Sequence, residues 1–129
     1  MIYTPEEKQR MDRLLEVFAD YLANSTEIDV AYAKKTGYVE LVIAENADYV
    51  YFPIENYDDM LQMFFYHVLC DEVKVACDRD PHLRNNTMDY KVPFERLCCI
   101  LAPLGEAGTY ERGELIKFIA HWKKQRQLP

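Results

Sequence analysis

The side chains best suited to metal chemistry in this 129-residue chain are His67, Cys70 and Cys77, together with the adjacent Cys98 and Cys99. A zinc site is usually built from two ligand pairs at short spacing, such as C-x2-C, that come from separate elements. His67 and Cys70 have a helical spacing of three residues, but the two adjacent cysteines do not form a second pair of the usual kind. We therefore expect no metal ion or other cofactor, and interpret the four cysteines as reduced, buried thiols.

Covalent or acid–base catalysis would need a nucleophile and a base that lie next to each other in the folded chain. His82 and His121 are the remaining histidines, and neither lies in a recognisable catalytic motif. The chain has no glycine-rich phosphate loop and no nucleophile elbow, and its many carboxylates are not paired in a pocket-like stretch. We therefore expect a non-enzymatic protein with no catalytic residues. A small-ligand enzyme or sensor that uses His67 or His82, with a site between helix 56–78 and loop 79–91, remains an alternative.

The elements that would position any site begin with an alternating block at residues 28–54, which predicts a three-stranded antiparallel β-meander. Two turns, at 34–37 and 45–48, join the strands. Both turns set the same register, with Val30 opposite Leu41, and this register gathers the apolar side chains on one inner face. The inner-face residues are Ile28, Val30, Tyr32, Val39, Leu41, Ile43, Val50, Phe52 and Ile54.

Helices are predicted on both sides of the meander from apolar residues at three- and four-residue spacing. Thr4 and Asn56 are the expected N-caps of the first two helices. The expected fold class is α+β, a three-stranded antiparallel β-meander packed against helices in the order α-β-β-β-α-α-α, as a single globular domain. Its elements over residues 1–129 are helix 4–24, the meander 28–54, helix 56–78, the loop 79–91 and an αα-hairpin at 93–126.

Composition and charge exclude several classes of protein. Half of the residues are hydrophobic, which is enough for a core at this length, and no apolar run is long enough to cross a membrane. The N-terminal residues do not resemble a signal peptide, so we expect a cytoplasmic protein. Residues 1–80 carry 17 acidic and 7 basic side chains, a net charge of −10, whereas residues 81–129 carry 5 and 8, a net charge of +3. This balance argues against direct binding of nucleic acid.

Tyrosines and acids gather on the outer face of the predicted meander, where solvated lysines would be usual. Tyrosine is enriched at protein interfaces because its ring offers a large contact area with one polar tip. The same pattern also fits a face that a helix of this chain covers, or tyrosine pairs that stabilise the sheet. The candidate residues for binding a protein partner are Asp29, Tyr38, Glu40, Asp48, Tyr49, Tyr51 and Asp58.

These features lead to the hypothesis of a small, acidic, cytoplasmic protein-protein interaction module that binds a basic protein surface. One form of this hypothesis is an inhibitor that acts as a decoy and occupies the nucleic-acid site of another protein. The alternative is a homo-oligomeric structural module, for example a homodimer, joined through helix 56–78, whose middle is apolar nearly all round. Met63 and Phe65 are the candidate residues for that interface.

Overall fold

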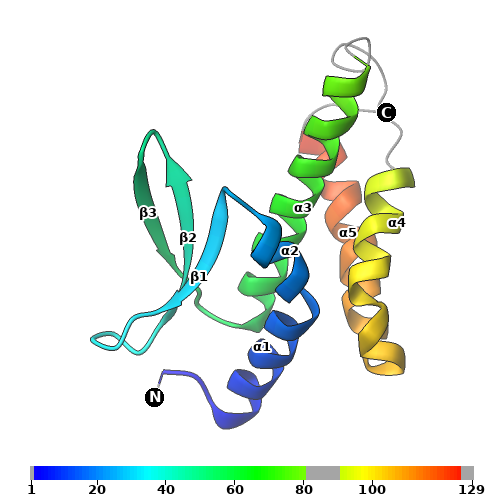
Figure 1. Cartoon of the computed structure of the whole chain (residues 1–129). Coiled ribbons are helices and arrows are strands. Elements are labelled where there is room, and N and C mark those ends of the chain that lie inside the picture. The colour runs from blue at the N-terminus through cyan, green and yellow to red at the C-terminus, as the bar shows by residue number, and fades with distance from the viewer. Residues whose placement is uncertain (1, 81–90, 126–129) are drawn as a thin grey trace. The chain divides into compact units, whose positions relative to one another are not determined.

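The computed structural model describes residues 2–80 and 91–125, and it confirms the predicted α+β class with a three-stranded antiparallel sheet (Figure 1). The order of elements, α-β-β-β-α-α-α, also agrees with the prediction once two short helices are counted together at the start. The elements are α1 (Pro5–Val17), α2 (Ala19–Asn24), β1 (Ile28–Tyr32), β2 (Val39–Glu45), β3 (Asp48–Pro53), α3 (Tyr57–Arg79), α4 (Lys91–Leu101), the 3-10 helix η2 (Ala102–Gly108) and α5 (Thr109–Gln125).

The chain divides into two compact units, Met1–Leu61 and Gln62–Pro129, and the boundary lies within α3. The first unit holds α1, α2, the sheet and the start of α3, and the second holds the rest of α3 with α4, η2 and α5. The single domain expected for the whole chain stays a prediction.

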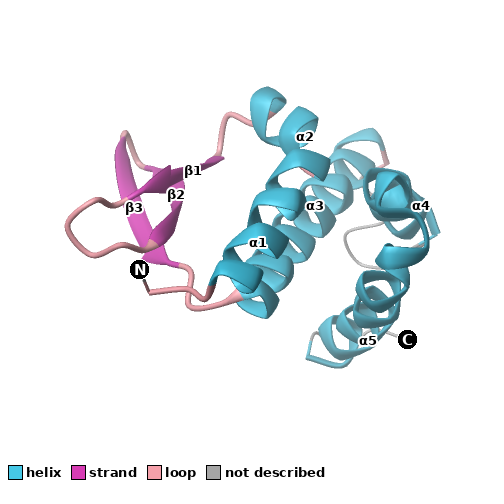
Figure 2. Ribbon diagram, turned by 90° about the horizontal axis from the view of Figure 1, so that it is seen from below, coloured by secondary structure: helices cyan, strands magenta, loops and turns pink. Residues whose placement is uncertain are grey.

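The predicted strand register is confirmed at every pair. Val30 lies opposite Leu41, and Leu41 lies opposite Phe52, in a sheet of order β1-β2-β3 that leaves β1 and β3 as its edges (Figure 2). The turn between β2 and β3 has two central residues, Asn46 and Ala47, both with positive φ (49° and 65°). Mirror-image turns of this kind suit the twist of a hairpin, so the short connection and the register support each other.

The inner face of the sheet is only partly covered. Four of its side chains are buried, whereas Tyr32 is 57% exposed and Phe52 is 42% exposed. Both exposed rings come from edge strands. The buried four are Ile28, Val39, Leu41 and Ile54.

The predicted helix at 4–24 is in fact two helices. Its start is as expected, because the hydroxyl of Thr4 accepts a hydrogen bond from the Glu7 N–H at 3.1 Å. The helix breaks at Phe18, whose backbone leaves the helical region (φ −95°, ψ 5°) while its ring is fully buried. Apolar residues keep their three- and four-residue spacing across Phe18, because the segments before and after it are both helical. The spacing alone therefore does not reveal the break.

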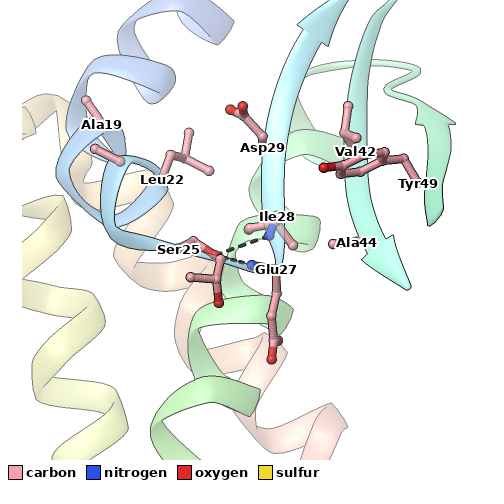
Figure 3. Close-up of a pocket in the computed structure, with 11 residues that line it drawn as sticks. Ala19, Leu22, Ser25, Glu27, Ile28, Asp29, Val42, Ala44 and Tyr49 are labelled. Carbon is pink, nitrogen blue, oxygen red and sulfur yellow. Dashed lines mark hydrogen bonds between the residues drawn. The ribbon is translucent and has the colours of Figure 1, made fainter. Parts of the chain in front are cut away.

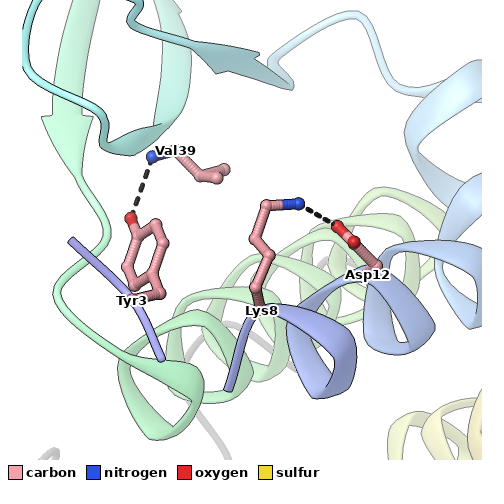
Figure 4. A network of polar contacts seen from close by, with 4 residues as sticks. All are labelled: Tyr3, Lys8, Asp12 and Val39. Atoms are coloured by element: carbon pink, nitrogen blue, oxygen red, sulfur yellow. Dashed lines mark hydrogen bonds and ion pairs between the residues drawn. The ribbon is translucent and has the colours of Figure 1, made fainter. Parts of the chain in front are cut away.

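A buried tyrosine outside all the predicted elements ties the N-terminal segment to the sheet (Figure 4). The hydroxyl of Tyr3 donates to the Ile54 carbonyl at 2.6 Å and accepts from the Val39 N–H at 2.8 Å. Its ring meets Tyr38 edge-on, with 6.2 Å between centroids. The same view shows the ion pair of Lys8 with Asp12 on α1. Tyr3 therefore satisfies two backbone groups at the ends of β2 and β3.

In the second unit, the apolar side of α3 packs with α5. Leu69 and Trp122 form a buried cluster, and the rings of Phe65 and Phe118 lie 5.8 Å apart. The predicted αα-hairpin is α4, η2 and α5, with α4 beside α5 (Figure 1). Its start is at Lys91 rather than residue 93, and its turn is the 3-10 helix η2. Residues 81–90 of the predicted loop lie outside the described residues.

Candidate protein-binding surface

Two of the three rows on the outer face of the sheet repeat one pattern, and the third row is Ala31, Glu40 and Pro53. In the first row Asp29, Val42 and Tyr51 lie opposite one another on β1, β2 and β3. In the second row the Ala44 N–H donates to the Glu27 carbonyl at 2.8 Å, and Ala44 lies opposite Tyr49. Each of these two rows thus runs from an acid through a small aliphatic residue to a tyrosine. In these two rows the carboxylates lie on or next to β1, the apolar side chains lie on β2 and the phenol rings lie on β3.

A pocket of about 530 Å³ lies between this face and α2 (Figure 3). Its sheet side includes Asp29, Val42 and Tyr49, and Figure 3 shows Asp29 between Leu22 of α2 and Val42. The helix side is formed by three apolar residues, and the segment that joins α2 to β1 closes one end. All lining residues belong to the first unit. The remaining lining residues are Ala19, Ala23, Ser25, Thr26, Glu27, Ile28 and Ala44.

The pocket combines apolar walls with acidic and hydroxyl groups, and none of its eleven lining residues is lysine or arginine. The Ser25 hydroxyl stabilises the wall, because it accepts hydrogen bonds from the N–H groups of Glu27 (3.3 Å) and Ile28 (3.2 Å). Tyr49 is 62% exposed and its neighbour Tyr51 is 55% exposed, so both rings are available to a partner. This arrangement suits a cationic group with an apolar stem.

Two of the predicted binding acids also protect the edges of the sheet. The Asp29 carboxylate accepts from the Val30 N–H, and the Asp48 carboxylate accepts from the Tyr49 N–H, each at 2.8 Å. The Ala33 N–H donates to the Tyr38 carbonyl, and the Ile54 N–H donates to the Val39 carbonyl. Along β1 and β3, the N–H groups of alternate residues, counted from these two, point toward β2. The N–H groups of Val30 and Tyr49 therefore point away from β2. Each carboxylate covers an outward donor that a further strand would otherwise use.

The other predicted binding residues are not brought together into the pocket. Glu40 lies on the outer face, half-buried and opposite Ala31 and Pro53. Tyr38 is half-buried against Tyr3, which indicates a structural contact. Asp58 lies apart from the sheet, exposed in the first turn of α3. The Asn56 side chain caps this helix as predicted, because it accepts from the Asp59 N–H at 2.8 Å.

The two residues predicted for an oligomer interface differ in exposure. Phe65 is fully buried and contacts Phe118 within its own unit, whereas Met63 is half-buried. A second copy of the chain cannot reach Phe65 where the structure places it. Packing inside the second unit therefore explains why an apolar residue stands at position 65 of this helix.

The candidate metal and catalytic residues do not form a centre in the part of the chain that the structure describes. Within residues 2–80 and 91–125, no three His, Cys, Asp or Glu side chains are grouped as metal ligands. His67 is half-buried with its ring edge-on to Tyr66, and His82 lies outside the described residues. The four cysteines are thiols and not disulfides, as expected, but Cys99 is exposed and the others are half-buried, which corrects the expected burial. Burial raises the pKa of Cys98, which keeps that thiol protonated.

The residues that sequence reasoning missed are those of α2 and the segment that follows it. The helix predicted at 4–24 includes Ala19, Leu22 and Ala23 at its end, and Ser25 and Thr26 lie between that helix and the meander. A run of small side chains next to an edge strand was the available signal, but it does not indicate on which face of the sheet the helix lies. Asp29 and Tyr49 of the pocket were predicted as binding residues, whereas Glu27 and the helical wall were not.

Comparisons of the chain with protein-family models, with curated proteins and with solved structures found no match. In the described residues, the helices are too short or too polar to cross a membrane.

Proposed function

We propose that this protein is an interaction module that binds a basic surface of another protein through the outer face of its sheet. The observation that carries this proposal is the repeated row of acid, aliphatic residue and tyrosine, with a pocket beside it that contains carboxylates and no basic side chain. Exposed tyrosines next to apolar residues are typical of interface centres, and flanking acids favour encounter with a cationic partner.

The charge of the first unit supports the same proposal. Residues 1–61 carry 13 acidic and 5 basic side chains, a net charge of −8, whereas residues 62–129 carry 9 and 10. The acidic field is therefore concentrated in the unit that contains the candidate surface. A partner that itself binds nucleic acid would present a surface of suitable charge, so an inhibitor that occupies such a site is one form of this function.

Charge reversal on the outer face is expected to weaken binding of a basic probe strongly. We would measure the affinity of a fluorescent nona-arginine peptide by anisotropy at about 50 mM and about 300 mM salt. The double variant Glu27→Lys/Glu40→Lys should bind roughly tenfold more weakly at the lower salt concentration, because two attractive charges on the face become repulsive.

The matched control is Glu95→Lys/Glu106→Lys, which makes the same change in net charge at exposed positions of the second unit. This control should retain most of the affinity. Equal weakening in both double variants would show that the peptide responds only to total charge, and would contradict a specific role for the outer face.

A further inference from the structure

The structure assigns a more specific task to the pocket beside α2: we propose that it receives one arginine side chain of the basic partner. This inference rests on the proposed function and names the group that is recognised. Three features carry it, namely the shape of the apolar walls, the carboxylate of Asp29 and the ring of Tyr49.

The apolar walls suit the aliphatic part of a long side chain. Ala19 and Ala23 come from α2, and Val42 and Ala44 come from the middle strand, so an extended methylene stem can pass between short side chains. Long cationic residues bury such stems against apolar surface while their charged ends stay near water. The volume of about 530 Å³ leaves room for the peptide units on either side of the inserted residue.

The charged end would meet the carboxylate of Asp29. One oxygen of this group already accepts from the Val30 N–H at 2.8 Å, which holds the side chain at the edge of the pocket. A carboxylate has two oxygens and several lone pairs, so it can accept further hydrogen bonds from a bound cation. Because the bond to Val30 orders the side chain beforehand, less conformational freedom is lost when the cation arrives.

Tyr49 favours arginine over lysine. Its ring lines the pocket together with Asp29, and a planar guanidinium can stack on a ring while it donates hydrogen bonds in its own plane to a carboxylate. An ammonium group has no planar face and keeps its water more strongly. Tyr51, on the same strand and similarly exposed, does not line the pocket. The two tyrosines therefore provide a matched pair for a test.

The test uses the full chain labelled with 15N and titrated with N-acetyl-arginine-N-methylamide, with the lysine and norleucine analogues as comparison probes. The arginine probe should cause saturable shifts of the amides of Ala23, Thr26, Asp29 and Ala44, with an affinity at least roughly fivefold above that of the lysine probe. The norleucine probe, which keeps the stem without the charge, should not saturate.

Tyr49→Ala should abolish the preference for arginine over lysine, and Tyr51→Ala should retain it. Equal affinities of the arginine and lysine probes for the unaltered chain, or saturable shifts confined to residues outside the pocket, would overturn the inference. These results are distinguishable from failure of the proposed function, because nona-arginine would still bind the outer face and remain sensitive to Glu27→Lys/Glu40→Lys. Loss of nona-arginine binding as well would overturn both.

Discussion

Replacing Tyr3 with phenylalanine is expected to lower the free energy of unfolding by roughly 2–4 kcal/mol. The phenol is 3% exposed, donates to the Ile54 carbonyl and accepts from the Val39 N–H. Phenylalanine keeps the ring but leaves the Val39 N–H buried without this acceptor, and an unsatisfied buried group costs more than the net value of the bond. Urea denaturation of both proteins, followed by circular dichroism, measures the difference.

The matched control is Tyr38→Phe, which removes a hydroxyl from the ring that Tyr3 contacts. Tyr38 is half-buried, so this change should alter stability by about 0.5 kcal/mol or less. Comparable losses in the two variants would contradict the assignment of the effect to the two hydrogen bonds of Tyr3.

The difference in unfolding free energy between the unaltered chain and Tyr3→Phe should become smaller as the pH rises in the alkaline range. Burial raises the pKa of Tyr3 above the value of a free tyrosine, which is about 10. The unfolded chain therefore loses this proton at lower pH than the folded chain, and the contribution of Tyr3 is full below pH about 10 and is lost as pH rises through the folded pKa. A difference that stayed constant from pH 8 to pH 11 would contradict this account of the phenol.

Removing both edge carboxylates is expected to cause self-association through the sheet. In Asp29→Ala/Asp48→Ala the outward N–H groups of Val30 and Tyr49 lose the acceptors that now lie 2.8 Å away. On β3, Pro53 has no N–H, and the outward N–H of Tyr51 is not covered in this way. In the double variant, the outward N–H groups of Tyr49 and Tyr51 would both be open to a strand from another copy. Light scattering should show a mean molar mass that rises roughly twofold or more with concentration.

Asp29→Asn/Asp48→Asn is the control, since asparagine keeps an acceptor oxygen in the same place and removes the charge. It should have the same oligomeric state as the unaltered chain. If both double variants associate equally, charge repulsion rather than coverage of the backbone keeps the edges apart, and the role assigned to these hydrogen bonds is wrong.

Local patterns predicted the sheet well. Alternation and two turns determine the register, because a slip of one residue would move every apolar side chain to the other face. The position of Tyr3 was not predictable in this way, since its partners are Val39 and Ile54, far away in sequence. The break at Phe18 was hidden for a related reason: helical spacing on both sides is compatible with one straight helix or with two.

The candidate surface was predicted in part. Strand alternation places Asp29, Tyr49 and Tyr51 on one face, and the structure confirms that arrangement of strands. Alternation does not reveal which side chains accept hydrogen bonds from the backbone N–H of the next residue, as Asp29 and Asp48 do. It also does not reveal that α2 lies beside the outer face, because the side on which a helix packs depends on the geometry of its connection rather than on its own composition.

Binding of a basic partner through the outer face of the sheet can be tested by mapping where a basic ligand contacts the chain. We would add nona-arginine to the 15N-labelled protein and follow all backbone amide shifts. Saturable changes should be largest in residues 27–31, 40–44 and 49–51, which lie on or next to β1, β2 and β3 at the outer face. Changes that are largest in the second unit, or in the acidic first turns of α1 and α3, would contradict binding through this face.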